Sequence, residues 1–380
     1  MRIDDIPNSS GPGVEGQQAE TIAQKQETLL QREKQEEREI TREQLSLRKR
    51  LLNWRTIVPL VIVVGLLVYL AQKAHIDPKQ TWTTVKQANV LFFLAAFLVY
   101  YASFLFRALR WRILLQNVGF TKDNGIHLPP FWKIVEIIYI SFFANSIVPA
   151  KLGDLYRAYL LRQEIRVSVS RGVGTILAER LLDLIVLLLL FIPAVIISLH
   201  ENLPPELRLA LEITLGAVII GIAALFVLRQ ARELIAKLVP ARFRGQYYHL
   251  QEGMLGSFRR LPLLASLTIG VWFCEALRFF FVAMALSLIP GNLIHILAAC
   301  VFIGLGEALL TVVPATGGGV GIVEGGMVAM IALFYQGADV ANHTAAAIVL
   351  DRMISFVSII VIGFLVFTIA FGKKAVREKR

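Results

Sequence analysis

Apolar runs of about 20 residues recur along this chain, and that is the length an α-helix needs to cross a lipid bilayer. The runs lie at 56–74, 88–106, 172–199, 207–228, 262–289 and 344–371. Two further hydrophobic regions, 131–161 and 293–336, are each interrupted by a short stretch with proline and glycine. The pattern predicts an all-α polytopic membrane protein with about six full spans and two broken helical hairpins.

The two interruptions read PAKLG at 149–153 and VVPATGGGVG at 312–321. Proline and glycine free backbone groups that cannot face hydrocarbon without hydrogen-bond partners, so each break must line protein or a water-filled cavity. The part of the first region after its break is too short for a second span. We therefore expect both regions to be re-entrant, each entering and leaving on one side of the membrane.

Composition and charge agree with a membrane protein. The chain is 56% hydrophobic, with a mean hydropathy of +0.62, which is too apolar for a soluble domain. Its net charge of +11 comes largely from basic stretches beside the apolar runs, which orients the protein rather than indicating nucleic-acid binding. The loops at 200–206, 290–292 and 336–343 contain no Lys or Arg. The alternation predicts an inner (plasma) membrane protein with both termini in the cytoplasm.

The charge pattern also divides the chain into parts. We expect a disordered and charged helical cytoplasmic extension at 1–50, a transmembrane domain at 51–372 and a basic cytoplasmic tail at 373–380. The stretch RALRWR at 107–112 is expected to be an interfacial loop, with arginines that reach toward the lipid headgroups and Trp111 as an anchor.

The two broken regions resemble one another. SIVPAKLGDLYRAYLL is followed by TILAERLLDLIVLLLL, and TVVPATGGGVGIVEGGMVAMI is followed by AIVLDRMISFVSIIVI. In both, a Val-Pro-Ala break precedes glycine and an acid, and a span opening with an acid–Arg pair follows. Three predicted spans separate the breaks, so the second unit would be inverted. This arrangement is typical of transporters with a site near the bilayer midplane.

Charged residues inside the apolar segments are the candidate site residues, because each costs at least ~2.5 kcal/mol in lipid and should face the protein interior. Asp154 and Arg157 are three residues apart and can pair. Either Arg157 holds a phosphate or the pair stabilises the fold. Glu179 and Asp183 share a helix face beside Arg180, and the same two interpretations stay open for them.

Other acids have simpler interpretations. Glu324 follows the glycine loop and complements a helix dipole, with a headgroup amine or proton site as the alternative. Glu275 and Arg278 are expected to neutralise one another, with a place in the lining of a cleft as the alternative. Glu136 and Glu307 stand alone in apolar surroundings, where either is a candidate proton carrier. No H-E-x-x-H, P-loop or G-x-S-x-G motif occurs, so we expect neither an enzyme nor a metal or cofactor site.

Three motifs in order carry a family resemblance. They are P-x-x-x-G-D-x-x-R at 149–157, E-R-x-x-D at 179–183 and P-x-x-G-G-x-x-G-x-x-E at 314–324. The chain resembles the lysylphosphatidylglycerol synthase transmembrane, or flippase-like, family, which includes the membrane part of AglD-type proteins. Two departures are a glycine loop one residue longer, without its second proline, and no aminoacyl-transfer domain. The resemblance therefore implies lipid movement rather than lipid synthesis.

Together these observations predict a lipid translocator that carries a phospholipid or polyprenyl-linked lipid through a charged cleft. A membrane enzyme acting on a lipid phosphate and a scaffold for a lipid-modifying synthase are the alternatives. Expected partners are membrane lipids with an anionic or polyprenyl-phosphate headgroup, with a lipid-modifying enzyme or a second copy of the chain as further candidates. The expected substrate-binding residues are Pro149, Gly153, Asp154, Arg157, Glu179, Arg180, Asp183, Pro314, Gly317, Gly318, Gly321, Glu324, Asp351 and Arg352.

Overall fold

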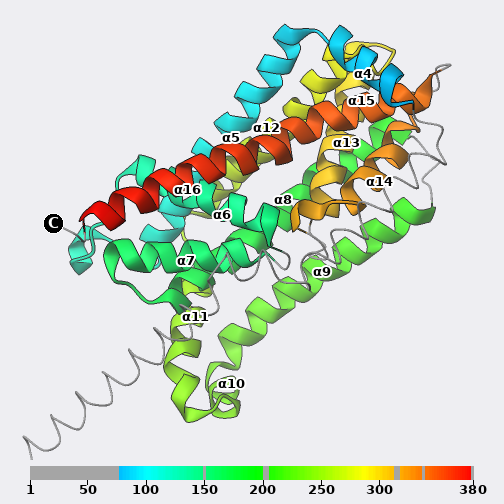
Figure 1. Ribbon diagram of the computed structural model, residues 1–380. Coiled ribbons are helices and arrows are strands. Elements are labelled where there is room, and N and C mark those ends of the chain that lie inside the picture. The colour runs from blue at the N-terminus through cyan, green and yellow to red at the C-terminus, as the bar shows by residue number, and fades with distance from the viewer. Residues whose placement is uncertain (1–76, 149–150, 200–204, 312–316, 336–338, 378–380) are drawn as a thin grey trace, which may run out of the picture. The chain divides into compact units, whose positions relative to one another are not determined.

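The computed structural model describes residues 77–148, 151–199, 205–311, 317–335 and 339–377. Regular structure in these ranges is helical throughout, with no strand among them (Figure 1). Five helical segments there are long and apolar enough to cross a membrane: Val90–Asn117, Val169–Ser198, Leu261–Ala285, Leu293–Leu310 and Val340–Ile369. The all-α membrane class is therefore confirmed. The predicted span at 56–74 and the N-terminal extension lie outside the described residues.

Helices α5 (Val90–Asn117) and α12 (Leu261–Ala285) pack against each other in antiparallel orientation. At one end, the backbone N–H of Asn89 donates to the carbonyl of Ala285 at 2.9 Å. At the other, Nδ2 of Asn117 donates to the carbonyl of Arg259 at 2.5 Å. The predicted loop at 107–112 is wrong, because α5 continues through it. Arg107 and Arg110 find acidic partners inside the protein, so the helix need not end where charge begins.

The first broken region forms two helices, α6 (Phe131–Ile147) and α7 (Leu152–Ile165), which pack against each other. The predicted break is confirmed, although Pro149 itself lies outside the described residues. Gly153 permits the close approach of the two helices, because a Cβ there would collide with the carbonyl oxygen of Ser141 and the backbone N of Asn145. A larger residue would force α7 away from α6.

The second broken region forms α13 (Leu293–Leu310), a 3₁₀ turn η3 (Gly317–Gly319) and α14 (Ile322–Ile331). Again the predicted break is present, and Pro314 lies outside the described residues. Gly318, Gly319 and Gly321 all have positive φ, the conformation that glycine adopts without strain. Because α13 alone is long enough to span, the expected re-entrant course of this region stays a prediction.

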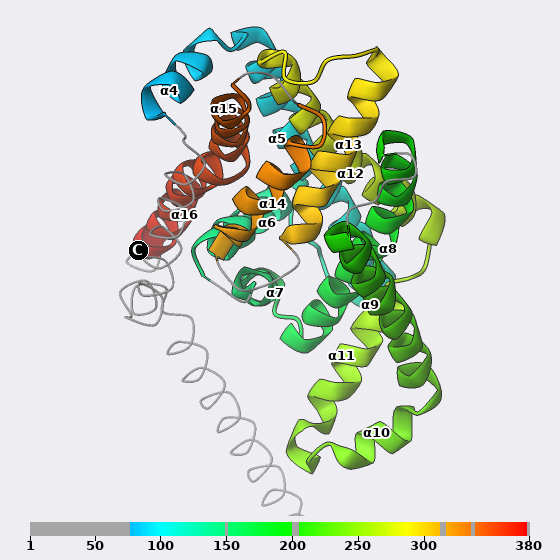
Figure 2. The same ribbon diagram turned by 90° about the vertical axis from the view of Figure 1, so that its right-hand side faces the viewer.

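Figure 2 shows α9 (Pro205–Gln230), α10 (Arg232–Leu238) and α11 (Arg244–Gly256) together at the lower right and α4 (Pro78–Gln87) at the upper left. In the chain, α8 (Val169–Leu199) is followed by α9, α10, the 3₁₀ turn η2 (Ala241–Phe243) and α11. Helix α11 packs against α8 where Gly174 and Gly253 let the two backbones meet. Two described elements lie earlier in the chain. They are helix α4 (Pro78–Gln87), which begins after its N-cap Asp77, and the short 3₁₀ turn η1 (Lys122–Asn124).

The C-terminal segment contains α15 (Val340–Arg352), one π-helical turn η4 (Met353–Val357) and α16 (Ser358–Arg377). The sequence pattern placed the start of this span at 344 and Asp351-Arg352 near its opening. Instead, Asp351 and Arg352 occupy the last turn of α15, directly before the π turn. Single π turns within helices are often found at functional sites, because they change which side chains face a neighbouring helix.

Candidate functional site

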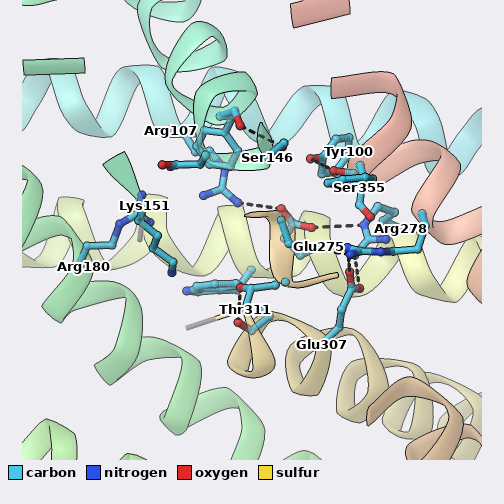
Figure 3. A pocket seen from close by; sticks show the side chains of 18 residues that line it. Tyr100, Arg107, Ser146, Lys151, Arg180, Glu275, Arg278, Glu307, Thr311 and Ser355 are labelled. Atoms are coloured by element: carbon cyan, nitrogen blue, oxygen red, sulfur yellow. Dashed lines mark hydrogen bonds and ion pairs between the residues drawn. The ribbon is translucent and has the colours of Figure 1, made fainter. Parts of the chain in front are cut away.

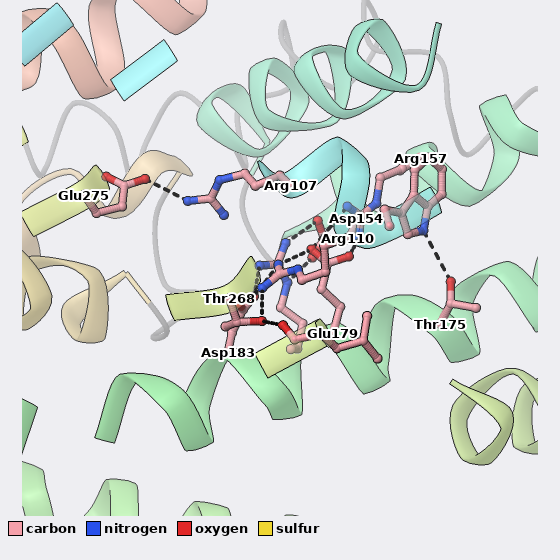
Figure 4. Close-up of polar contacts among 12 residues, drawn as sticks. Arg107, Arg110, Asp154, Arg157, Thr175, Glu179, Asp183, Thr268 and Glu275 are labelled. Atoms are coloured by element: carbon pink, nitrogen blue, oxygen red, sulfur yellow. Dashed lines mark hydrogen bonds and ion pairs between the residues drawn. The ribbon is translucent and has the colours of Figure 1, made fainter. Parts of the chain in front are cut away.

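Arg110 on α5 is the centre of a buried charge cluster (Figure 4). Its side chain is fully buried, Nη1 donates to Oδ1 of Asp183 at 2.5 Å, and Nη2 donates to Oε1 of Glu179 at 2.8 Å. Nη1 also donates to the hydroxyl of Thr268 on α12 at 2.9 Å. The expectation of an interfacial anchor is wrong here, because two carboxylates on one face of α8 neutralise this arginine inside the protein. The expected shared face of Glu179 and Asp183 is confirmed.

Arg157 and Asp154 on α7 do not pair with each other. Arg157 donates from Nη2 to Oε2 of Glu179 at 3.0 Å, and its guanidinium lies over the ring of Trp111 at 4.7 Å. Asp154 instead accepts two hydrogen bonds from Arg180 on α8, each 2.9 Å long. The i, i+3 spacing predicted the wrong partners, because α8 offers each side chain an opposite charge with better geometry.

Arg278 on α12 is the centre of a second buried cluster. It forms ion pairs with Asp351 on α15 and with Glu307 on α13, the latter at 2.6 Å. Its Nε donates to Glu275 at 3.3 Å, so the expected neutralisation of Glu275 by Arg278 is confirmed. The sequence pattern presented Glu307 as an isolated acid, and this is wrong because it pairs with Arg278. Glu136 is also paired, with Lys133 at 2.7 Å.

An ion pair at the start of α14 completes the second cluster. Arg352 donates from Nε to Oε1 of Glu324 at 2.6 Å. The other oxygen of Glu324 accepts the backbone N–H of Gly321 at 2.5 Å, which caps the start of α14. The predicted helix-terminal role of Glu324 is therefore confirmed, and an ion pair is added to it.

The two clusters share one pattern of partners. In each cluster, an arginine of α5 or α12 forms an ion pair with an acid of α8 or α15. The arginine that follows this acid in sequence forms an ion pair with the third residue of α7 or α14. The corresponding residues are Arg110 and Arg278, Glu179 and Asp351, Arg180 and Arg352, and Asp154 and Glu324.

A sequence signal for the central arginines exists but is short. It is RALRW at 107–111 and EALRF at 275–279, which aligns Arg110 with Arg278. The first residues of these two segments, Arg107 and Glu275, form an ion pair with each other at 2.7 Å. Matching positions of α5 and α12 therefore meet where the two helices cross.

A cavity of about 180 Å³ lies between the two clusters (Figure 3). Its wall includes residues of α5, α6, α8, α12, α13, η3 and α15, together with the link between α6 and α7. Five basic and two acidic side chains line it, a formal charge of +3: Arg107, Lys151, Arg180, Arg278, Arg352, Glu275 and Glu307.

The expected site residues differ in how they relate to this cavity. Gly318, Arg180 and Arg352 line it. The ion-pair clusters and helix starts behind the wall hold Gly153, Asp154, Arg157, Glu179, Asp183, Gly321, Glu324 and Asp351. Gly317 belongs to η3. Pro149 and Pro314 lie outside the described residues. Sequence reasoning missed the cavity-lining Arg107, Lys151 and Trp272, because no local pattern shows that α5, α12 and the link between α6 and α7 meet.

The chemistry of the wall suits an anion with several oxygens. The basic side chains present N–H donors, and phosphate oxygens accept such hydrogen bonds. Aromatic rings of Phe142, Trp272 and Phe356 complete the wall, so the cavity is amphipathic. Within the described residues, no group of His, Cys, Asp and Glu side chains is placed to hold a metal ion.

Comparison with known proteins agrees with a membrane assignment. A family model described as the lysylphosphatidylglycerol synthase TM region matches residues 56–363. A UPF0104 membrane protein of Methanocaldococcus jannaschii is 33% identical over 231 residues, which cover 60% of this chain and 94% of the relative. A UPF0104 membrane protein of Pyrococcus horikoshii is 23% identical over 78% of this chain and 92% of the relative.

A third relative has a named activity. The glycosyltransferase AglD of Haloferax volcanii is 28% identical over 142 residues, which cover 37% of this chain and 22% of that protein. The similarity thus concerns a minor part of AglD. The resemblance found from the three motifs is confirmed by these matches.

Proposed function

We propose that this chain, which belongs to the family of the lysylphosphatidylglycerol synthase TM region, moves a phosphate-bearing lipid between the two leaflets of its membrane. The headgroup occupies the cavity between the two charge clusters, and the acyl or prenyl chains stay in the bilayer. The observation that carries the proposal is the cavity itself. Both broken regions contribute to its wall, and α5, α8, α12, α15 and the link between α6 and α7 place basic side chains around its polar space.

The energetic problem of lipid movement is the headgroup. A charged group in hydrocarbon costs several kcal/mol, and hydrogen-bond donors fixed in a protein wall replace the lost water. A volume of about 180 Å³ admits a phosphate with a small substituent but excludes the lipid chains. The acyl or prenyl chains of the lipid therefore remain in the bilayer while its headgroup passes through the protein.

We further propose that the two halves are inverted repeats. Three observations support this: the antiparallel packing of α5 and α12, the repeated partner pattern of the clusters, and the ion pair between the matching residues Arg107 and Glu275. A two-fold axis in the membrane plane brings matching residues together in this way. Opening of one half or the other would then expose the cavity to one leaflet at a time.

The proposal contains no covalent step. Since the sequence has no nucleotide-binding motif, movement would run down the lipid gradient or be coupled to an ion. A cytoplasmic position of both termini and an inner (plasma) membrane location remain parts of the proposal, supported by the distribution of Lys and Arg in the loops.

The test is transbilayer movement in proteoliposomes of the purified full chain, with fluorescent lipids and an impermeant quencher. Faster movement than in protein-free vesicles is expected for at least one phosphate-bearing lipid. Ala308→Phe should abolish the increase, because Ala308 lines the cavity and a phenyl ring would fill it. Leu309→Phe, one residue further along α13 and outside the cavity wall, is the matched control.

Two results would overturn the proposal. One is a rate equal to that of protein-free vesicles for anionic, zwitterionic and polyprenyl-phosphate lipids alike. The other is an unchanged rate in a folded Ala308→Phe protein, since this would show that headgroups do not pass through the cavity.

A further inference from the structure

We propose that Lys151 makes this site selective for lipids whose headgroup is anionic, with the Lys151 ammonium bound to the headgroup phosphate. The inference rests on the proposed function for its setting but names a property that lipid movement alone does not require. A phosphate with an uncharged substituent, as in phosphatidylglycerol, should be preferred to one that carries a quaternary amine, as in phosphatidylcholine.

Lys151 differs from the other cations of the cavity in forming no ion pair with any described residue. The four arginines of the wall are each held by a carboxylate, in the pairs Arg107–Glu275, Arg180–Asp154, Arg278–Glu307 and Arg352–Glu324. For the ammonium of Lys151, the described part of the chain provides no ion pair or hydrogen bond. Figure 3 shows it beside Arg180 in the cavity wall. Its charge is therefore free to meet a ligand.

Two further donors in the same wall also lack partners. Nε of Arg107 and Nε1 of Trp272 are buried and make no hydrogen bond within the described structure, and the two residues are 5% and 9% exposed. Ammonium, guanidinium and indole groups donate hydrogen bonds and accept none. A ligand that satisfies all three must supply acceptors, as phosphate oxygens do.

The acids of the wall explain why an amine would be rejected. Glu275 and Glu307 are the two carboxylates that line the cavity, and both are already bound to Arg278. Glu275 is bound to Arg107 as well. A quaternary amine entering with its phosphate would meet Lys151 and Arg180 without a free carboxylate to receive it. Like-charge repulsion would therefore disfavour zwitterionic lipids.

The backbone at Lys151 supports a role for its side chain. Lys151 precedes α7 with a φ of 52°, a left-handed conformation that is unfavourable for a residue with a Cβ. The corresponding position before α14 is Gly321, with a φ of 93°. Glycine satisfies this geometry without strain, so stability alone favours glycine at 151. Strain of this kind clusters at functional sites. Arg166, Arg260 and Ser287 also have positive φ, but of these four residues Lys151 is the one that lines the cavity.

The ammonium is also charged under ordinary conditions. Lys151 lies in the link between α6 and α7, outside the helices long enough to span. Burial, and then the neighbouring Arg180, lower the pKa of Lys151 to about 8, so most of the population is protonated at pH 7. Asp154 and Asp183 raise this pKa in part, but burial and Arg180 outweigh them, and an anionic headgroup would supply further compensation.

The experiment compares binding and movement of two lipids in four versions of the full chain. Calorimetry of the purified protein in micelles measures binding of dihexanoyl phosphatidylglycerol, dihexanoyl phosphatidylcholine and inorganic phosphate. The proteoliposome assay measures movement of the corresponding fluorescent lipids. The versions are wild type, Lys151→Met, Lys151→Arg and Lys133→Met, a matched control because Lys133 pairs with Glu136 away from the cavity wall.

Loss of one charge-assisted hydrogen bond should weaken phosphatidylglycerol binding by roughly tenfold or more in Lys151→Met. Phosphatidylcholine binding should change less than about twofold, and Lys151→Arg should retain the preference. Lys151→Met should also fold, since it leaves no partner unpaired. Selective binding without movement in wild type would overturn the proposed function and support the role of Lys151.

Three outcomes would overturn the role of Lys151. They are equal loss for both lipids in Lys151→Met, no loss for either, and binding of inorganic phosphate as tight as that of phosphatidylglycerol. The last result would show a general phosphate site rather than a lipid headgroup site.

Discussion

The cluster around Arg110 should be a principal determinant of stability, and a double-mutant cycle measures this. Arg110 is fully buried and makes its shortest contact, 2.5 Å, with Asp183, whose other ion pair, with Arg180, is longer at 3.4 Å. Arg110→Met leaves Asp183 without its main partner, and Asp183→Asn leaves Arg110 with one charged partner fewer. Breaking a buried pair in this way costs ~3–5 kcal/mol of unfolding free energy, more for Arg110→Met because Glu179 also loses a bond.

The double variant should be less destabilised than the sum of the two singles by about 2 kcal/mol, because the second change removes a charge that the first left unpaired. Steric trapping or detergent-induced unfolding in bicelles measures each free energy. A matched cycle with Lys133→Met and Glu136→Gln, whose side chains are 31% and 29% exposed, should give a coupling below about 1 kcal/mol. Additive effects at Arg110 and Asp183, within about 0.5 kcal/mol, would refute the argument that this pair links α5 to α8.

Two further predictions concern the first broken region. Gly153→Ala should lower the unfolding free energy by about 1–3 kcal/mol in the same assay, because the added Cβ would meet the backbone of α6 at Ser141. Gly216→Ala is the control, since the space around Gly216 is open and the substitution should not destabilise the protein. An equal effect of both substitutions would contradict the close-packing argument. Movement of phosphatidylglycerol should fall as pH rises from 7 to 9, since Lys151 loses its proton near pH 8 while Arg180 stays charged. The other charged groups near Lys151 are Asp154 and Asp183. A pH profile unchanged in Lys151→Met would show that another group titrates.

Hydrophobic run length predicted most of the helices of this protein correctly. The spans at 172–199 and 262–289 appear as α8 and α12 with ends shifted by a few residues, because about 20 apolar residues in lipid have no alternative to a helix. The breaks before Gly153 and Gly321 also followed from sequence, since proline and consecutive glycines interrupt a helix in any surroundings. These features depend on local backbone chemistry.

Charged residues show where sequence reasoning failed. RALRWR looked like a loop because arginines beside a span usually mark its end. In the structure, Arg110 continues α5 through that stretch, because Glu179 and Asp183 of α8 are placed to receive it. A partner 69 or 73 residues away leaves no trace in the local pattern.

The sequence by itself determined that this chain is helical, spans a membrane and is interrupted twice by proline and glycine, because each of these follows from a run of neighbouring residues. Only the tertiary structure decided which charged side chains form ion pairs, and which cation of the cavity has none among the described residues. Arg180 pairs with Asp154 and Arg352 with Glu324 through the packing of separate helices, whereas Lys151 lines the cavity without an ion pair in the described part of the chain. Pairing between distant side chains depends on distances that no local pattern contains.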